Sequence, residues 1–472
     1  MPESTTTSEP SRGVEYAWQL LSAGHPIAAI DRCRALLAAD DNDARTWLVL
    51  AQALLIAGRA AETLDAADAA LDRMAETACA WFLRGTALAC LGETAAAVIA
   101  LRRAAALDPG DGKIQLNLGN ALTALDQLEA AETALVAART LSPSAEAHAS
   151  LAALRLLQAR PHEALAGYQA ALVLQPDNPA ITWDFGFTCH LTGDSPAGWW
   201  AWRVRKPEEQ AVIDRLPLAG PEWTGQGTPK HLLVISTQGL GDAIQFARYL
   251  PLPDIAATLV CAPGLVPLLA QLVATSPDTA DCPDHDAWTT LADLPRLLPP
   301  FPMPVPYLSA IPATSSASGI GLAWTGNAHH LNNARRSLPP GLLDPLLAVT
   351  GRRFVSLQPG HSTPAGIVDL GGALTDLAAT ASVISGLDLV ITVDTVVAHL
   401  AGALGKPVWI LLPYSPDWRW GLNRDATPWY PAARLFRQPA PGDWPSVVAA
   451  VISALKDPEW TVSLNNTPRS MR

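Results

Sequence analysis

The first 200 residues carry an amphipathic helical pattern that returns at a fixed interval. Proline recurs at Pro109, Pro143 and Pro176, spaced 34 and 33 residues apart, and Gly85 precedes Gly119 by 34. Small residues at such positions let two helices approach closely, and bulky residues elsewhere in the period fill the space between units. Proline ends the second helix of each pair because it has no N–H and clashes with the preceding turn. The period predicts a series of helical hairpins.

A hairpin of this kind cannot bury its apolar face alone, so neighbouring units stack into a solenoid. The pattern predicts about five units over residues 13–178 and a partial sixth to 205, with Asp41 and Ala75 standing where proline recurs later. Such a solenoid offers a concave groove to a peptide or protein. Alternatively, the repeats serve only as a scaffold or dimerise the protein.

After residue 205 the pattern changes to a proline-rich linker at 206–229 and then to short apolar runs alternating with helical stretches. This alternation predicts parallel sheets with helical crossovers. It favours two Rossmann-like units, at 230–315 and 316–460, with residues 1–12 and 461–472 disordered. The expected strands lie at 231–237, 257–263, 319–326, 352–358, 388–394 and 407–413, and the expected helices at 375–387, 395–405 and 442–456.

Composition narrows the class of protein. Of 472 residues 49% are hydrophobic and 16% charged, which excludes a disordered chain. The net charge of −12 argues against non-specific binding to nucleic acid. Six scattered cysteines form no C-x-x-C pair, so neither a zinc site nor a disulfide framework is expected. Without an apolar leader or membrane span in the sequence, we expect a cytoplasmic protein.

Three motifs stand where a predicted strand ends. The first is Gly239-Leu240-Gly241-Asp242, at the start of a helix. Open α/β sheets bind ligands at such places, where glycines admit a ligand to the backbone and the helix N-terminus favours an anion. Asp242 is expected to act either as a general base or as a helix cap.

The second motif runs from Asp394 to His399, again between a strand and a helix. We expect Asp394 to cap the helix and the N–H groups near Thr395 and Val396 to point outward, an arrangement that suits a diphosphate. The alternative is a plain capped helix with a histidine in the core.

The third motif joins Thr325-Gly326-Asn327 to Arg335 and Arg336 through a loop with His329 and His330. Paired arginines beside a strand end favour a phosphate clamp. A solvated basic loop is the alternative. Gln358, at the end of another strand, is a candidate for contact with a base or ribose.

In this order, GLGD (239–242), TGN with RRSLP (325–327 and 335–339) and DTVVAH (394–399) resemble glycosyltransferase family 9, which contains the bacterial heptosyltransferases. The whole chain resembles bacterial proteins that fuse tetratricopeptide repeats to such a module, down to QGLGDAIQFARYLPL at 238–252 and the Asp-Trp-Arg-Trp block at 417–420. The resemblance implies a GT-B fold behind the α-solenoid. It departs at Val396, where heptosyltransferases have glycine.

The resemblance further implies an inverting, metal-independent transferase with a nucleotide-diphosphate sugar as co-substrate and no cofactor. Asp242 would be the catalytic base. The donor would be bound by Gly239, Gly241, Thr325, Asn327, Arg335, Arg336, Gln358, Asp394, Thr395, Val396 and His399.

Two further groups of residues are assigned to structure. Asp284-His285-Asp286 is interpreted as a solvated loop rather than a metal site, and Asp417 and Arg419 as a structural ion pair. For Trp409, Trp418, Trp420 and Trp429 we expect packing, with stacking on a sugar or base as the alternative.

Three functions stay open for the chain. The first is O-glycosylation of a protein held in the repeat groove, such as flagellin or another surface protein. The second is transfer to a lipopolysaccharide or polysaccharide. The third is a non-catalytic binding or scaffold protein with a decayed transferase domain. A homo-oligomer is compatible with each.

Overall fold

The computed structural model describes residues 9–252, 254–278, 282–298, 303–310, 318–328, 330 and 332–457. The chain forms two compact units, one made of Met1–Arg155 with Glu163–Asp177 and the other of Leu156–His162 with Asn178–Arg472. Of the ends predicted to be disordered, 461–472 and 1–8 lie outside the described residues. Residues 9–12 are helical, which corrects that prediction.

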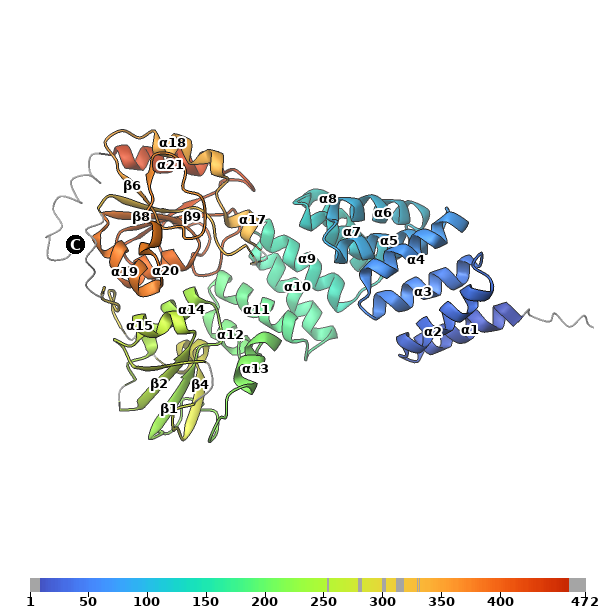
Figure 1. Ribbon diagram of the computed structural model, residues 1–472, viewed down its shortest axis with the longest axis horizontal. Coiled ribbons are helices and arrows are strands. Elements are labelled where there is room, and N and C mark those ends of the chain that lie inside the picture. The colour runs from blue at the N-terminus through green and yellow to red at the C-terminus, as the bar shows by residue number, and fades with distance from the viewer. Residues whose placement is uncertain are drawn as a thin grey trace, which may run out of the picture. The chain divides into compact units, whose positions relative to one another are not determined.

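The first unit consists of antiparallel helical hairpins, coloured blue to cyan in Figure 1. The second helices of successive hairpins begin at residues 26, 60, 94, 128 and 161, which confirms the predicted repeat. The helices are α1 Glu9–Ser22, α2 Pro26–Ala39, α3 Ala44–Ile56, α4 Ala60–Arg73, α5 Ala78–Cys90, α6 Thr94–Leu107, α7 Gly112–Ala124, α8 Leu128–Leu141, α9 Ala145–Leu157 and α10 Pro161–Leu174.

Glycine lets the two helices of a hairpin approach each other closely. A Cβ placed on Gly85 would lie 2.6 Å from Leu101 Cγ, and one on Gly119 would lie 2.5 Å from Leu135 Cγ. Real Cβ atoms essentially never come so near. The buried leucines therefore fill the space that the missing side chains leave, as the repeat pattern predicts.

The repeat pattern continues into the second unit, in α11 (Pro179–Thr192) and α12 (Ser195–Ala201). Within that unit these helices pack on the α/β part, as when the His190 ring stacks on Trp418 with the ring centroids 4.5 Å apart. The predicted linker at 206–229 is wrong in character, because it contains helix α13 (Pro207–Asp214), whose Ile213 packs against a sheet. Proline is compatible with a helix here because it occupies the first turn.

The first parallel sheet has the strand order β3-β2-β1-β4. Its first strand, β1, pairs with β2 on one side and with β4 on the other, with Ile235 beside Val260 and Thr290. Its elements are β1 His231–Ile235, α14 Leu240–Phe246, η1 Ala247–Tyr249, β2 Ala256–Cys261, η2 Pro263–Leu265, α15 Val266–Leu269, β3 Ala274–Pro277, β4 Ala287–Thr290, η3 Leu291–Asp293 and α16 Leu294–Leu297.

The second parallel sheet has the order β10-β9-β8-β5-β6-β7, and its first strand, β5, again lies inside the sheet between β6 and β8. Its elements are β5 Ile320–Ala323, α17 Asn333–Arg336, η4 Pro340–Leu342, α18 Asp344–Leu347, β6 Phe354–Ser356, β7 Ile367–Val368, η5 Gly371–Ala373, α19 Leu377–Gly386, β8 Leu389–Val393, α20 Val396–Ala403, β9 Val408–Leu412, β10 Ala433–Arg437 and α21 Trp444–Lys456.

The predicted strands are all present, and the pattern missed four more: β3, β4, β7 and β10. All four lie at the edges of the two sheets. An edge strand has one unpaired side, so it tolerates polar residues and lacks a continuous apolar run. β3, with the sequence ATSP and no buried residue, is an example.

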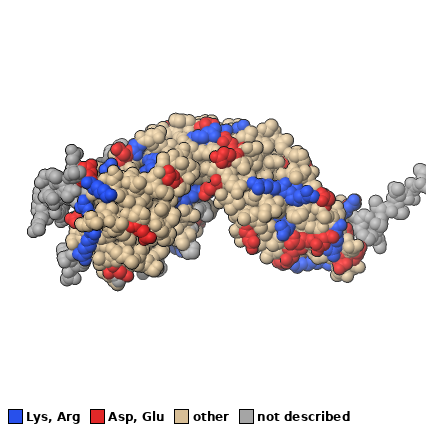
Figure 2. Space-filling model, turned by 90° about the horizontal axis from the view of Figure 1, so that it is seen from above, with Lys and Arg blue, Asp and Glu red and all other residues tan. Residues whose placement is uncertain are grey.

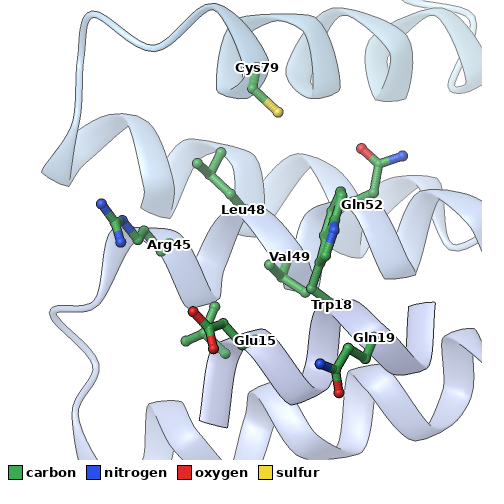
Figure 3. Close-up of a pocket in the computed structure, with 9 residues that line it drawn as sticks. Glu15, Trp18, Gln19, Arg45, Leu48, Val49, Gln52 and Cys79 are labelled. Atoms are coloured by element: carbon green, nitrogen blue, oxygen red, sulfur yellow. The ribbon is translucent and has the colours of Figure 1, made fainter. Parts of the chain in front are cut away.

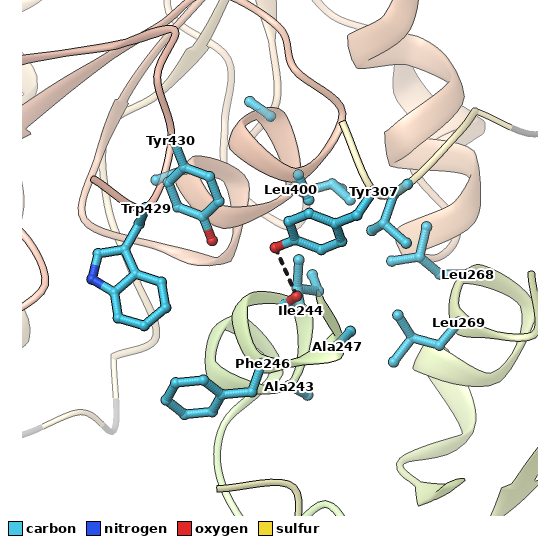
Figure 4. Packing of buried hydrophobic residues seen from close by; sticks show 14 of the residues in the cluster. Ala243, Ile244, Phe246, Ala247, Leu268, Leu269, Tyr307, Leu400, Trp429 and Tyr430 are labelled. Carbon is cyan, nitrogen blue, oxygen red and sulfur yellow. Dashed lines mark hydrogen bonds between the residues drawn. The ribbon is translucent and has the colours of Figure 1, made fainter. Parts of the chain in front are cut away.

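The two sheets share one hydrophobic core, which runs through α14 and α20. Figure 4 shows the centre of this core. Phe246 and Ala247, which follow β1 of the first sheet, lie there with Leu400 and Tyr430, which follow β8 and β9 of the second sheet. Tyr307 is 5% exposed, and its hydroxyl donates to the Ile244 carbonyl at 3.0 Å. The helices that begin at the two strand ends are thereby packed against each other.

Charged side chains of both signs are interspersed on the face shown in Figure 2, with broad uncharged areas between them. Within the described part of the chain, every helix is too short or too polar to cross a membrane.

Candidate functional site

A cavity of about 510 Å³ lies at the carboxyl ends of β1, β5 and β8. In both sheets these ends flank the point where the strand order reverses, which is where open α/β sheets bind ligands. Eleven of the twelve predicted site residues line the cavity. The lining comprises Gly239, Leu240, Gly241, Asp242, Ala323, Thr325, Gly326, Asn327, His330, Arg336, Leu357, Gln358, Pro359, His361, Asp394, Thr395, Val396, Val397, His399, Asp417 and Arg419.

The turn after β1 brings Asp242 to the cavity without making it a cap. Gly239 is the N-cap of α14, and Asp242 lies in the first helical turn, where its carboxylate accepts a hydrogen bond from Arg419. This corrects the capping alternative. Gly241 is needed because a Cβ there would lie 2.8 Å from His399 Cδ2. The turn therefore holds a carboxylate beside a closely packed imidazole.

Arg419 is the central cation of the site, although sequence analysis assigned it only a structural ion pair with Asp417. Its guanidinium is bonded to Asp242, to Gln245 and, at 2.9 Å, to Asp417 Oδ1. The residue is 7% exposed. Burial disfavours the charged form, but the Asp417 and Asp242 carboxylates outweigh it and hold the pKa of Arg419 above its usual value.

The turn after β8 differs by one residue from the prediction. Thr395, not Asp394, is the N-cap of α20, and its hydroxyl accepts a hydrogen bond from the Val397 N–H at 3.3 Å. Asp394 instead lines the cavity, where burial and the Asp417 carboxylate raise its pKa to about 6 against the opposing charges of Arg336 and Arg419. The threonine hydroxyl satisfies only one N–H, so the helix start keeps donors for an anion.

His399 is buried and neutral. Burial lowers the pKa of its imidazole to about 3, with Arg419 acting in the same direction. Its Nδ1 lies 2.9 Å from the Tyr430 hydroxyl. At neutral pH His399 therefore contributes a hydrogen-bonding ring to the cavity, and no positive charge.

The turn after β5 brings one of the two predicted arginines to the cavity. A Cβ on Gly326 would lie 2.6 Å from Arg336 Nη2. The guanidinium can therefore pack against the backbone of Gly326 because this residue has no side chain. The Thr325 hydroxyl lies 2.9 Å from that of Ser337. Arg335 does not line the cavity. Adjacent positions on α17 point about 100° apart, which explains why the expected clamp has one arginine rather than two.

Gln358 lines the cavity but also fixes its wall. Its Oε1 accepts hydrogen bonds from the backbone N–H groups of Trp324 at 3.2 Å and Thr325 at 3.1 Å. This oxygen therefore joins the end of β6 to the turn after β5. The side-chain N–H₂ is the part of Gln358 left to face a ligand.

Ten lining residues were not predicted as site residues, and four of them have ionisable side chains: His330, His361, Asp417 and Arg419. The two charged residues alternate with the buried Trp418 and Trp420 in the block 417–420. The available signal was two charged residues among tryptophans; the structure shows this block as a turn, in which the Trp420 N–H donates to the Asp417 carbonyl at 3.1 Å. His329, the other histidine of the predicted loop, lies outside the described residues.

The tryptophans pack among themselves and against the core, the first of the two expected roles. Trp418 contacts His190, Trp199 and Trp202, while Trp409 lies against Phe436 at 5.2 Å between ring centroids.

The segment Asp284-His285-Asp286 holds the amino end of β1, the end of this strand opposite the cavity. Asp286 accepts hydrogen bonds from the N–H groups of Lys230 at 3.0 Å and His231 at 2.9 Å, at the start of β1. It is thus a structural element and not merely a solvated loop. Over the residues that the structure describes, no group of three His, Cys, Asp or Glu side chains is arranged to hold a metal.

The model of glycosyltransferase family 9 (heptosyltransferase) matches residues 357–442. This range contains Gln358, the 394–399 motif, Asp417 and Arg419. Protein FlbA of Caulobacter vibrioides is 28% identical over 316 residues, which cover 55% of this chain and 52% of FlbA. The chain thus spans about half the length of this curated relative.

Two solved structures illustrate what the chain is similar to. TTC0263, a thermophilic TPR protein of Thermus thermophilus, matches at 22% identity and a TM-score of 0.34, covering 38% of this chain and 98% of that one. PilW, a type IV pilus biogenesis factor, matches at 17% identity and a TM-score of 0.40, covering 44% and 100%. With the repeat and the two parallel sheets described above, the family match leads to one conclusion: the chain carries a glycosyltransferase family 9 domain at its C-terminal end, preceded by tetratricopeptide-like hairpins.

Proposed function

We propose that the protein is an inverting, metal-independent glycosyltransferase that uses a nucleotide-diphosphate sugar. The observation that carries this proposal is the meeting of a carboxylate, Asp242, and a cation, Arg336, in one cavity between two parallel sheets. The family match at 357–442 supports the same class of reaction.

Asp242 is the proposed general base. It removes the proton from the acceptor hydroxyl as that oxygen attacks the anomeric carbon of the donor sugar. The bond between this carbon and the diphosphate oxygen breaks, and its electron pair leaves with the diphosphate. Attack from the face opposite the leaving group inverts the anomeric centre.

Arg336 and the start of α20 are proposed to bind the diphosphate. The N–H groups near Thr395 and Val396 carry the positive end of the helix dipole, and Arg336 adds a full charge. Gly239, Gly241 and Asn327 would border the donor, with the Gln358 N–H₂ group facing its base or ribose. The neutral His399 would act as a hydrogen-bonding partner only.

Calorimetry with a panel of nucleotide-diphosphate sugars tests the donor site. Arg336→Ala should lower the affinity for the donor that binds by about ten- to a hundredfold, since a charge-assisted hydrogen bond is worth about 1.5–3 kcal/mol. Arg335→Ala is the matched control, because Arg335 is adjacent on α17 but outside the cavity lining. Equal losses in both variants, or unchanged affinity in Arg336→Ala, would refute the assignment.

The repeats are proposed to hold a polypeptide acceptor. A cavity of about 450 Å³ lies among α1, α3 and α5, and Figure 3 shows the indole of Trp18 next to Val49 and Gln52, with Leu48, Glu15 and Arg45 further along the lining. Its lining is predominantly apolar, with Trp18 52% exposed. An apolar side chain of an extended peptide fits this chemistry, and the two charges offer partners to its polar neighbours. The six cysteines, all described and unpaired, suit a cytoplasmic location.

Transfer of labelled sugar into separated protein, lipid and polysaccharide fractions tests the acceptor. Label should enter protein, and Trp18→Ala should lower this incorporation while leaving donor affinity unchanged. Tyr16→Ala is the matched control, since Tyr16 is 53% exposed on the same helix but outside the cavity. Label in a lipopolysaccharide or polysaccharide fraction instead would replace the polypeptide acceptor with the alternative.

A further inference from the structure

Arg419 reaches the proposed base from a segment that none of the three strand-end motifs includes. It follows β9, within the block 417–420, and its Nη2 donates to Asp242 Oδ1. Its Nε donates to Gln245, on the same helix α14 as Asp242, and its Nη1 donates to Asp417 Oδ1 at 2.9 Å. One guanidinium thus contacts two residues of the helix that carries the base.

Two aromatic rings lie close to the guanidinium. Its carbon lies 4.6 Å from the centroid of the Trp418 ring and 5.7 Å from that of Phe246. The Arg419 carbonyl accepts hydrogen bonds from Thr427 and Arg424, both at 3.0 Å. Main chain and side chain are both fixed, so Arg419 cannot follow a moving carboxylate without breaking several contacts.

The repeat-like hairpin α11–α12 completes this support. The His190 ring of α11 stacks on Trp418 at 4.5 Å between centroids, and Trp199 and Trp202 lie 5.6 and 5.5 Å from it. Burial lowers the pKa of His190 to about 3, so the ring is neutral and packs as an aromatic group. All these residues belong to the second compact unit.

Asp242 needs such a partner to present one defined oxygen. It lies in the first turn of a seven-residue helix and makes no capping hydrogen bond. Arg419 binds Oδ1, while Oδ2 lies toward Gly239, where a Cβ would be only 3.2 Å away. Gly239 has no side chain to cover Oδ2, and the Asp242 side chain is 29% exposed.

We propose that Arg419 is the positioning residue of the base: it fixes Asp242 through Oδ1, so that Oδ2 receives the acceptor proton. The inference rests on the proposed function, because it requires Asp242 to act as a base. Arg419 acts through Asp242 and not on the leaving diphosphate. The aromatic cluster from α11, α12 and Trp418 sets the position of Arg419.

A double-mutant cycle on kcat tests this assignment. A misplacement of about 1 Å costs on the order of a hundredfold in rate, so Arg419→Ala should lower kcat by about that factor. In the Asp242→Asn background the same substitution should lower kcat less than about threefold, because effects that act through one group do not add. Donor affinity by calorimetry should stay unchanged.

Chemical rescue separates positioning from loss of the fold. Guanidinium ions should enter the space between Trp418 and Phe246 in Arg419→Ala and restore kcat about tenfold or more. Sodium chloride at matched ionic strength should not restore it, and guanidinium should not rescue Asp242→Asn. Arg434→Ala, an exposed arginine on β10, is the control for loss of an arginine elsewhere and should keep the wild-type kcat.

Three results overturn the proposal: a full loss of rate from Arg419→Ala in the Asp242→Asn background, weaker donor binding, or no rescue by guanidinium. The first two would place Arg419 on the leaving group, and the third would make its role purely structural. Wild-type protein without turnover or binding for any donor in the panel would refute the proposed function itself.

Discussion

Gly241 couples the packing of α14 to the position of the proposed base, and Gly241→Ala tests this coupling. A Cβ at this position would lie 2.8 Å from His399 Cδ2, whereas ordinary contact begins at 3.4 Å. One of the two groups must therefore move by about 0.6 Å. His399 is 6% exposed and tied to Tyr430, so the helix with Asp242 is the group that shifts.

The expected magnitude follows from this displacement. If 1 Å costs about a hundredfold, a shift of about 0.6 Å lowers kcat by about tenfold to twentyfold. For stability, overpacking costs about 1–3 kcal/mol, while replacing a helical glycine by alanine returns up to about 1 kcal/mol. The net destabilisation is about 0–3 kcal/mol.

Nucleotide release at saturating donor gives kcat, and thermal melting reports stability. Gly264→Ala is the matched control, since a Cβ on Gly264 meets nothing within 4 Å. It should keep wild-type kcat and melting temperature. A wild-type kcat in Gly241→Ala, or an equal loss in Gly264→Ala, would show that the contact with His399 does not position Asp242.

Two further substitutions test the carboxylates of the cavity. Asp242→Asn should lower kcat by about 10²–10⁴-fold because the amide cannot accept the proton, while donor affinity stays close to wild type. The melting temperature should fall, because the buried Arg419 guanidinium loses one of the two carboxylates that compensate its charge. Unchanged turnover would return the role of base to another cavity residue. Burial raises the pKa of Asp394 from 3.8 to about 6, so the folded state holds this proton more tightly than the unfolded chain does and the contribution of Asp394 to stability falls as the pH rises through that window. Asp394→Asn removes the ionisation, and its melting temperature relative to wild type should rise between pH 3.8 and 6 and then level off. A difference that is constant with pH would contradict this account.

Features that depend on neighbours along the chain were predictable from the sequence. The hairpin period follows from the spacing of glycine and proline, and the interior strands follow from apolar runs such as 389–393, in which every residue is buried. Three strand-end motifs identified most of the cavity, because the carboxyl ends of parallel strands lie at one edge of a sheet. These motifs provide Asp242, Arg336 and the start of α20.

Orientation within a motif was less predictable. The sequence predicted both arginines at the site, whereas Arg336 lines the cavity and Arg335 does not, because a shift of one residue turns a side chain by about 100° on a helix. It also predicted Asp394 as the cap of α20, where the structure has Thr395. The apolar pattern also did not predict edge strands such as β10, since a strand with one unpaired side needs fewer apolar residues.

The tertiary structure alone decided which distant segments meet. Arg419 is 177 residues from Asp242 in the sequence, and no periodicity links a block after β9 to a turn after β1. The charge of His399 was likewise decided by burial, which no local pattern specifies. The hairpin α11–α12 has the repeat sequence, and the tertiary structure brings its His190 and the adjoining Trp202 against Trp418, which buries aromatic surface from water. The sequence thus determined the elements and the strand ends that bear polar groups, whereas side-chain packing between distant segments determined which groups surround the proposed base.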